Sequence, residues 1–442
     1  MSRPDLVLDA ARAVVGGEER PCVVAVADGR IVALDPGTSD ASEVVRLGED
    51  VVLFPGLVDT HVHVNEPGRT EWEGFSHATR AAAAGGVTTI LDMPLNSIPA
   101  TVDVEALETK RRAAAGQCHV DVGFWAGAVP TNRHELHRLW QAGVFGFKCF
   151  LVDSGVEEFP ALDDARLEDV MERLSSFGGL LLVHAEDPDA LLPCPPGGRS
   201  YSDFLASRPD DAEVSAVMTV VEAARRTGCR VHVVHVSAAS TLPVLAGARA
   251  AGVPVTAETC PHYLALSAEE VPDGATAYKC CPPIRDSGNR EQLWAALADG
   301  TLGCVVSDHS PSTTDLKAMD TGVFADAWGG ISSLQLALPV VWTEARGRGH
   351  GLVDVAAWMA SGPADRAGLR RKGRIAVGAD ADFCVFAPDE SSVVDPARLA
   401  HRNPVTPYAG RELAGDVRAT WLRGRRIDPS APRGRLLSRG DA

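Results

Sequence analysis

Two histidines, His61 and His63, have the residue type and the spacing to bind a metal ion. They stand in DTHVHVNEPG, at the end of an apolar run. Because side chains alternate across a β-strand, both imidazoles are expected on the same side of this strand. Imidazoles are good ligands for borderline divalent metals such as Zn(II), so the pair could share one ion. The motif is short and common, so its meaning depends on the residues that end the other strands.

Two further histidines end runs of the same kind. His184 follows the apolar run in LLLVHAED, and His235 does so in VHVVHVSA. A single histidine of this sort is often a packing residue satisfied by a backbone carbonyl, but its recurrence at equivalent strand ends favours a shared site. His232 lies an odd number of residues from His235. The alternation of side chains therefore predicts that His232 faces away from the site, into helix packing.

An aspartate and a lysine in apolar runs complete the set of candidates. Asp308 ends GCVVSDHSP, where a carboxylate is costly to bury unless it is paired or bound to a cation. It could ligate a metal and accept a proton from an attacking water. Lys148 stands in VFGFKCFL, where burial lowers the pKa of its amine; the neutral amine could react with carbon dioxide to give a carbamate that bridges two cations. The alternatives, a helix-capping aspartate and a lysine paired with an acid, stay open.

Apolar, β-branched runs that alternate with helical stretches must position these residues. The runs lie at 51–63, 87–94, 119–128, 144–150, 180–186, 231–237, 253–260 and 303–310, and helical stretches include 73–84, 162–177, 211–227 and 242–251. Continuously apolar strands separated by helices are typical of a parallel sheet covered on both faces. Eight such units predict an α/β protein with a closed (β/α)8 TIM barrel, in which catalytic groups gather at the C-terminal ends of the strands.

The two ends of the chain predict a second, smaller unit. Residues 5–47 and 373–428 contain short alternating strands with turn signals, and neither end is long enough to bury a core alone. We expect them to meet as one small β-sandwich-like domain beside the barrel. The predicted division is residues 1–50 and 373–442 for the two parts of this domain, and 51–372 for the barrel.

Composition excludes several classes of protein. The chain has 442 residues, of which 45% are hydrophobic, and a formal net charge of -17. An acidic protein repels phosphate backbones and anionic lipid, so nucleic acid and membranes are poor partners. No apolar run reaches the roughly 18 residues of a membrane span, and the N-terminus lacks the pattern of a signal peptide. Ten cysteines without a CxxC pair are typical of reduced thiols, and we expect a cytoplasmic protein.

Seven motifs carry a resemblance to a known family. They are HVHVNEPG, GFKCFLVDSG, VHAED, VVHVS, ETCPHYL, KCCPPIRD and VVSDHSPSTTDLK, in this order. Their order and spacing resemble the dihydroorotase–hydantoinase–allantoinase branch of the amidohydrolase superfamily, over about residues 53–424. The resemblance implies a homotetramer with two divalent metal ions per subunit, expected to be Zn(2+). It also implies the metal ligands His61, His63, Lys148 as a bridging N6-carboxylysine, His184, His235 and Asp308.

Pocket positions distinguish the members of this branch. Dihydroorotases carry an arginine where this chain has Asn65, and a histidine where it has Ser312. Hydantoinases and dihydropyrimidinases carry a tyrosine at the position of Asp153 and a serine at that of Cys281. An uncharged substrate needs no carboxylate-binding cation. The stretches EPGRTEWEGF, DMPLNSIPATVD, GFKCFLVDSGVEEFP and AWGGISSLQ resemble allantoinases, so the expected reaction is hydrolysis of the hydantoin ring amide of allantoin to allantoate, in purine and ureide catabolism.

The mechanism that the resemblance implies assigns one residue a proton-transfer role. Two cations would lower the pKa of a shared water, and Asp308 would take its proton and pass it to the leaving ring nitrogen. Candidates for substrate contacts are Asn96, Cys281, Ser310 and Trp328, although each could equally be a packing or turn residue. His262 could face the pocket or brace a loop. The alternatives are a hydantoinase or dihydropyrimidinase, a dihydroorotase, and a non-catalytic scaffold with the same fold.

Overall fold

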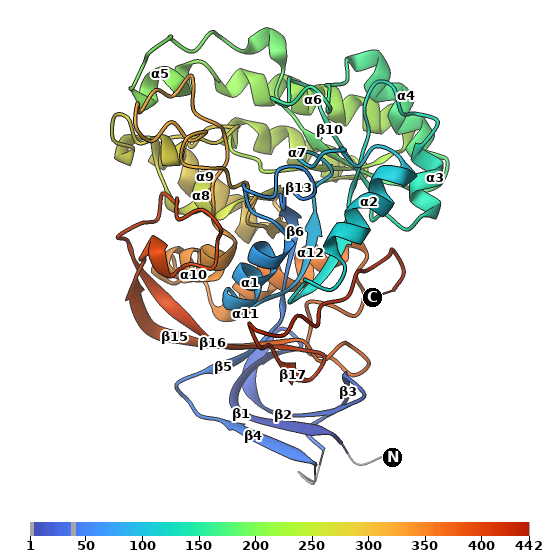
Figure 1. Cartoon of the computed structure of the whole chain (residues 1–442), viewed down its shortest axis with the longest axis vertical. Helices are drawn as coiled ribbons and strands as arrows, with labels where there is room; N and C mark the ends of the chain where they lie inside the picture. Colours follow the sequence, from blue (N-terminus) through green and yellow to red (C-terminus); the bar gives the residue numbers. More distant parts are fainter. Residues whose placement is uncertain (1–3, 37–40, 442) are drawn as a thin grey trace.

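Parallel strands form a closed barrel in the upper part of the molecule (Figure 1). The computed structural model describes residues 4–36 and 41–441. One row of strands is β6 (Leu57–Val62), β7 (Val87–Asp92) and β8 (Asp121–Phe124). The other is β9 (Ala126–Gly127), β10 (Phe147–Phe150), β11 (Leu180–His184), β12 (Arg230–Val233), β13 (Val255–Thr259) and β14 (Cys304–Val305).

The ring of strands is closed at two places. Strands β8 and β9 are consecutive in the chain, and β8 pairs with β7 while β9 pairs with β10. On the other side, a parallel bridge joins Val62 at the end of β6 to His309 just after β14. Each of the eight predicted runs supplies strand residues to this ring, which confirms the (β/α)8 barrel.

Helices cover the outside of the barrel and connect its strands. The longer ones are α1 (Phe75–Ala84), α2 (Val104–Ala114), α4 (Asp164–Ser175), α6 (Asp210–Thr227), α7 (Leu242–Ala250), α9 (Ser287–Ala298) and α10 (Ala337–Gly347). Shorter ones are α3 (Leu136–Gln141), α5 (Tyr201–Ala206), α8 (Pro261–Ala265), α11 (Leu352–Ala356) and α12 (Gly362–Ala367). Helix α4 begins where the Asp163 side chain accepts a hydrogen bond from Arg166 N. Its buried residues recur at helical spacing, at Leu167, Val170, Met171 and Leu174.

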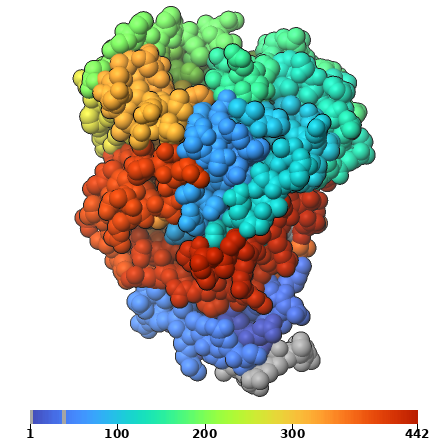
Figure 2. Space-filling model, viewed as in Figure 1, coloured from blue at the N-terminus to red at the C-terminus, as the bar shows by residue number. Residues whose placement is uncertain are grey.

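Segments from both ends of the chain form one mixed sheet. The N-terminal strands are β1 (Leu6–Val15), β2 (Glu18–Ala27), β3 (Arg30–Leu34), β4 (Glu43–Leu47) and β5 (Val52–Pro55), and the C-terminal ones are β15 (Phe383–Val393), β16 (Glu412–Leu422) and β17 (Arg425–Arg426). The strand order is β17-β16-β15-β5-β1-β2-β3, with β4 beside β1. The antiparallel pairing of β15 with β5 therefore joins the two ends, as predicted. The N-terminal strands occupy the lower end of the molecule in Figures 1 and 2. The domain boundaries at residues 50 and 372 stay predictions.

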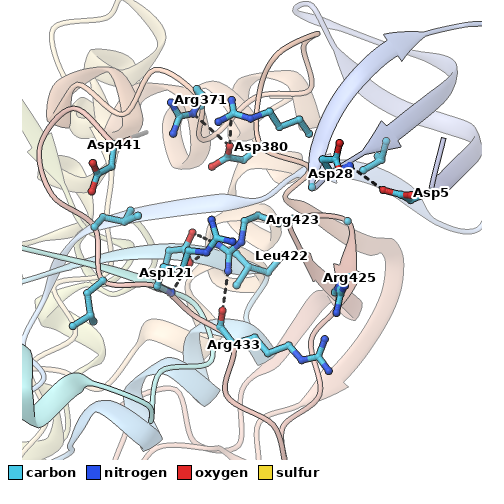
Figure 3. Close-up of a pocket in the computed structure, with 17 residues that line it drawn as sticks. Asp5, Asp28, Asp121, Arg371, Asp380, Leu422, Arg423, Arg425, Arg433 and Asp441 are labelled. Carbon is cyan, nitrogen blue, oxygen red and sulfur yellow. Dashed lines mark hydrogen bonds and ion pairs between the residues drawn. The ribbon is translucent and has the colours of Figure 1, made fainter. Parts of the chain in front are cut away.

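Buried charges hold this sheet against the barrel. Lys372 Nζ lies 2.6 Å from Asp121 Oδ2, 2.7 Å from Asp382 Oδ2 and 3.0 Å from Asp380 Oδ2. Arg423 donates to both carboxylate oxygens of Asp121 (Figure 3). Asp121 begins β8, so a hollow of about 930 Å³ at this junction lies at the end of the barrel opposite Asp308. Within residues 4–36 and 41–441, no helix combines the length and apolarity needed to cross a lipid bilayer.

Candidate active site

A cavity of about 250 Å³ opens at the C-terminal ends of the barrel strands. All ten residues predicted to bind metal or substrate line it. They are His61, His63, Asn96, Lys148, His184, His235, Cys281, Asp308, Ser310 and Trp328. His262 is buried but does not line this cavity; its ring packs 4.2 Å from that of Tyr263, centroid to centroid. The structure therefore brings the predicted residues together, and their individual roles stay predictions.

His61, His63 and Asp308 form one group of possible ligands. Asp308 Oδ1 lies 3.1 Å from His61 Nε2 and 3.7 Å from His63 Nε2. One ligand atom from each residue falls within 4.8 Å of the others. Strand β6 ends at Val62, and the two imidazoles share one side of it, as the alternation of side chains requires. Nitrogen and carboxylate donors at this spacing suit a divalent transition metal.

His184, His235 and Lys148 lie beside this group. The ring centroids of His184 and His235 are 4.6 Å apart, and those of His61 and His235 are 5.4 Å apart. His235 and Asp308 both adopt left-handed backbone conformations, with φ of 42° and 43°. Such strain in non-glycine residues is held by the surrounding structure and is concentrated at functional sites. The strand ends are thus bent so that these two side chains reach the cavity.

His232 does not line the cavity, but the prediction that it packs against helices was wrong, and the left-handed turn at His235 explains why. Strand β12 ends at Val233, so an alternation counted back from His235 does not apply across this turn. His232 Nε2 lies 2.9 Å from Glu258 Oε2, and its Nδ1 lies 2.7 Å from Thr256 Oγ1. His232 therefore faces the barrel interior below the site rather than the helices.

Two buried glutamates orient the histidines of the site. Glu258 Oε1 lies 2.6 Å from His61 Nδ1, and Glu186 Oε2 lies 2.7 Å from His184 Nε2. A carboxylate on one ring nitrogen fixes the tautomer and leaves the other nitrogen for a metal. The free nitrogens are then Nε2 of His61 and Nδ1 of His184. Carboxylate–histidine pairs of this kind accompany metal ligands in proteins.

Burial sets the protonation of the site. It lowers the pKa of His63 and His235 well below the usual value and lowers that of His184 to about 4, so these imidazoles are neutral near pH 7. Burial also lowers the pKa of Lys148 to about 8, although the charge of Asp308 opposes this. Burial raises the pKa of Asp308, whereas His61 and Lys148 lower it. Neutral nitrogen donors are the form that binds metals.

Lys148 differs from every other lysine of the chain. The chain has five lysines, and all are buried. Four of them donate hydrogen bonds to carboxylates or backbone carbonyls: Lys110, Lys279, Lys317 and Lys372. Lys148 Nζ has no hydrogen-bond partner among the described residues, and it lies 4.7 Å from the Phe150 ring centroid. His63 Nδ1 and His235 Nδ1 are likewise buried without such partners. Buried nitrogen atoms without hydrogen-bond partners are unusual in proteins, and their presence here fits a site that binds metal ions.

Residues 327–330 line the cavity, and two lysines hold the loop of residues 324–330 by its backbone. Lys279 Nζ donates to the carbonyls of Phe324 and Ala327, and Lys317 Nζ donates to those of Trp328 and Gly330. These contacts place Trp328 at the cavity, where its indole Nε1 is buried without a partner in the described part of the chain.

Gly330 and Asn96 also line the cavity. Gly330 has φ of 136°, and a Cβ there would lie 2.3 Å from the Ser310 carbonyl oxygen, so the contact requires glycine. Asn96 has φ of 64°, and its side-chain Oδ1 is buried without a partner among residues 4–36 and 41–441. The wall thus offers an unused acceptor on Asn96 and an unused donor on Trp328.

Sequence reasoning missed several residues of the site. Glu258 gave a usable signal, because a glutamate inside the apolar run 253–260 is costly to bury without partners. Arg208 and Lys317 lie in loops, where no periodicity indicates the direction of a side chain. Arg208 lines the cavity, so the absence of an arginine at Asn65 does not leave the cavity without a cation.

Comparisons with known proteins agree with this fold and site. A sequence model of the amidohydrolase family matches residues 52–427, and the chain belongs to that family. It is a hydrolase, and the buried histidines and aspartate together with the family indicate a divalent metal site. Among named relatives, the allantoinase of Streptomyces avermitilis is 58% identical over 446 residues, covering 99% of this chain and 100% of that protein.

Other relatives extend the comparison. The allantoinase of Saccharomyces cerevisiae is 47% identical, over 86% of this chain and 83% of that protein. Among solved structures, an L-hydantoinase (dihydropyrimidinase) from Arthrobacter aurescens matches with a TM-score of 0.91 and 27% identity, over 99% of this chain and 98% of that one. A D-hydantoinase from a Bacillus species matches with a TM-score of 0.89 and 28% identity, over 98% and 99% of the two chains.

Proposed function

We propose that this protein is an allantoinase, which hydrolyses the hydantoin ring amide of allantoin to give allantoate in purine and ureide catabolism. The observation that carries the proposal is the convergence of four histidines, Asp308 and an unpartnered Lys148 on one cavity at the strand ends. The full-length similarity to proteins named allantoinase supports this choice of substrate.

The proposed metal centre uses the six ligands predicted from the sequence: His61, His63, Lys148, His184, His235 and Asp308. Two divalent ions, expected to be Zn(2+), would supply an activated water near neutral pH and polarise the carbonyl of the ring. The depressed pKa of Lys148, about 8, supports its reaction with carbon dioxide to an N6-carboxylysine. The lack of a hydrogen-bond partner at Nζ within the described residues supports the same assignment, because a paired ammonium would have one.

Asp308 is the proposed general base and acid. Its carboxylate would accept the proton of the attacking water and then give it to the leaving ring nitrogen. Burial raises the pKa of Asp308, which makes its carboxylate a better proton acceptor than an exposed aspartate. Glu258 holds His61 through Nδ1, and the other ring nitrogen of His61, Nε2, lies 3.1 Å from Asp308 Oδ1. Glu258 therefore helps to orient His61 toward Asp308.

The proposed substrate contacts are Asn96, Cys281, Ser310 and Trp328. A ureide offers both N–H donors and carbonyl acceptors. The unpartnered Oδ1 of Asn96 and Nε1 of Trp328 supply one acceptor and one donor at the cavity wall, which supports their assignment to hydrogen bonds with the substrate. Ser310 and Cys281 would complete the wall. A cytoplasmic homotetramer belongs to the same proposal.

A second candidate is a hydantoinase or dihydropyrimidinase, because hydantoinases share the fold along the whole chain. Initial rates of the metal-loaded protein with allantoin, hydantoin, dihydrouracil and dihydroorotate distinguish the candidates. The proposal expects the highest kcat/KM with allantoin. Faster turnover of dihydrouracil or dihydroorotate would overturn the choice of substrate. Absence of turnover with all four would favour a non-catalytic scaffold.

A further inference from the structure

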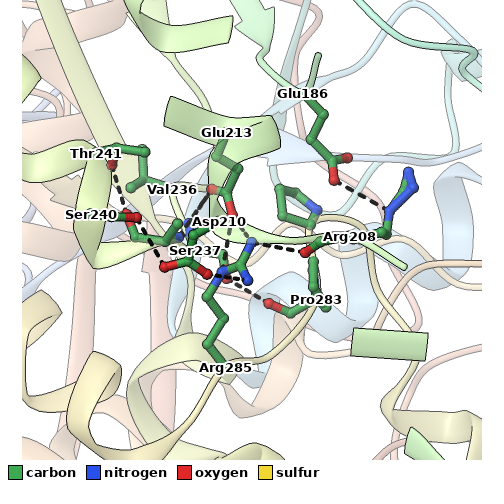
Figure 4. Close-up of polar contacts among 12 residues, drawn as sticks. Glu186, Arg208, Asp210, Glu213, Val236, Ser237, Ser240, Thr241, Pro283 and Arg285 are labelled. Carbon is green, nitrogen blue, oxygen red and sulfur yellow. Dashed lines mark hydrogen bonds and ion pairs between the residues drawn. The ribbon is translucent and has the colours of Figure 1, made fainter. Parts of the chain in front are cut away.

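Arg208 lies in the loop between α5 and α6, and its side chain reaches the active-site cavity. The side chain is 16% exposed, and Nε lies 3.2 Å from Oε1 of the fully buried Glu186. Figure 4 shows this contact between the two side chains. The carbonyl oxygen of Arg208 accepts a hydrogen bond from Arg285 Nη2, and Arg285 is itself held by Glu213. A backbone hydrogen bond and an ion pair with Glu186 therefore hold Arg208 in place.

The terminal nitrogens of Arg208 are free. No hydrogen bond joins either Nη to another described residue. The contact of Nε with Glu186 is an ion pair without hydrogen-bond geometry, so Nε is also buried without an acceptor among the described residues. Because Arg208 lines the cavity, the exposed part of its guanidinium offers N–H donors to whatever occupies that space. An arginine that is largely buried and has unused donors is costly unless a ligand or water completes them.

The charge of Arg208 is already balanced. Glu186 is fully buried, and its carboxylate contacts Arg208 through Oε1 and His184 through Oε2. This ion pair offsets the charge of the guanidinium. A carboxylate-bearing substrate would place a second negative charge beside Glu186. A neutral carbonyl oxygen accepts the same hydrogen bonds without that repulsion.

We propose that Arg208 determines specificity by donating hydrogen bonds from its terminal nitrogens to the carbonyl oxygen of the substrate's neutral ureido substituent. This inference rests on the proposed function, because allantoin is a hydantoin that carries a ureido group. The same residue contacts Glu186, which orients His184. A purely structural role through His184 is therefore the alternative that the experiment must separate from substrate recognition.

The experiment compares allantoin with hydantoin, which has the same ring without the ureido group. Arg208→Lys keeps the positive charge beside Glu186 but loses the planar pair of donors. Arg208→Gln, which loses the charge, is the second variant. Arg226→Lys, on the exposed face of α6, is the matched control. For each protein, kcat/KM is measured with allantoin, hydantoin is measured as a substrate and as a competitive inhibitor, and metal content is determined.

The proposal expects Arg208→Lys to lower kcat/KM for allantoin by about 10–100-fold, the loss of one hydrogen bond to a charged group. Hydantoin turnover or inhibition should change less than about threefold, with metal content and the control unchanged. Equal losses for both compounds, or a loss of metal, would assign Arg208 a structural role and overturn the inference. Unchanged kcat/KM for allantoin would also overturn it. If the wild-type protein opens other rings but not allantoin, the proposed function itself fails.

Discussion

Glu258 and His61 meet across the barrel interior, with Oε1 of the glutamate 2.6 Å from Nδ1 of the histidine. The other oxygen of Glu258 lies 2.9 Å from His232 Nε2, so one carboxylate is held between two rings. Burial raises the pKa of Glu258, but its contacts with His232 and His61 outweigh this and lower the pKa to about 2. A permanent negative charge therefore orients His61, with Nε2 turned toward Asp308.

Replacement of this carboxylate should weaken the proposed metal centre. Glu258→Gln keeps the shape of the side chain but removes the charge that orients His61. We expect metal affinity to fall by about 10–100-fold, as for other partners of metal-binding histidines. Competition with a chelator of known affinity measures the change. Glu269→Gln, an exposed acid that accepts from Ser287 N, is the control. Unchanged affinity in Glu258→Gln would show that the contact does not support a metal ligand.

Lys148 should be essential for hydrolysis. Lys148→Ala removes the amine that is proposed to carry the carbamate, and we expect kcat to fall by more than about 100-fold, beyond the loss caused by a partner of a ligand. A small carboxylate such as acetate should restore part of the activity, because it supplies the two oxygens that the variant lacks. Steady-state rates with and without acetate test this expectation. Undiminished hydrolysis by the variant would refute the bridging carbamate.

Loss of the contacts of Lys317 should lower the kcat/KM of hydrolysis. Lys317→Met removes the donor to the carbonyls of Trp328 and Gly330, so the loop of residues 324–330 loses one of the two lysines that hold it. Misplacing a substrate-contacting wall by about 1 Å can lower the rate by about 100-fold, so we expect kcat/KM to fall by about 10–100-fold. Circular dichroism and thermal unfolding show whether the variant is folded. A folded variant with wild-type kcat/KM would contradict the role of this loop.

The charges between the barrel and the small sheet should control acid stability. Burial raises the pKa of Asp121, but Lys372 and Arg423 outweigh this effect and lower it below the usual value. The folded carboxyl thus releases its proton more readily than the unfolded one. Its contribution to stability is present above pH of about 4 and is lost as pH falls through the lowered pKa.

Lys372→Met should reveal this dependence. The variant leaves buried aspartates short of a partner, and we expect it to lose about 3–5 kcal/mol of unfolding free energy near pH 7. The difference from the wild type should shrink as pH falls below about 4, because protonated aspartates no longer need the lysine. Thermal unfolding at a series of pH values measures both effects. If the difference in unfolding free energy between the variant and the wild type grew toward low pH, the result would contradict this prediction.

Much of the fold and of the cavity could be predicted from the sequence, because the signals lie in the local pattern of residues along each strand. Strands of a barrel are continuously apolar, so polar residues such as His184 and Asp308 at their ends are conspicuous. Relations between distant residues were not predictable in this way. The left-handed turn at His235 breaks the alternation of side chains between His232 and His235. The position of Arg208 depends on contacts with Glu186 and Arg285. These contacts are set by tertiary packing rather than by periodicity.

Diffraction from metal-loaded crystals, collected at the absorption edge of the metal, is the sharpest test of the proposed metal centre. Two anomalous peaks are expected in the cavity. One should lie among His61, His63 and Asp308, the other beside His184 and His235, and density for a carboxylated Lys148 should join them. Peaks elsewhere, or a Lys148 without added density and without a neighbouring ion, would contradict the proposed centre.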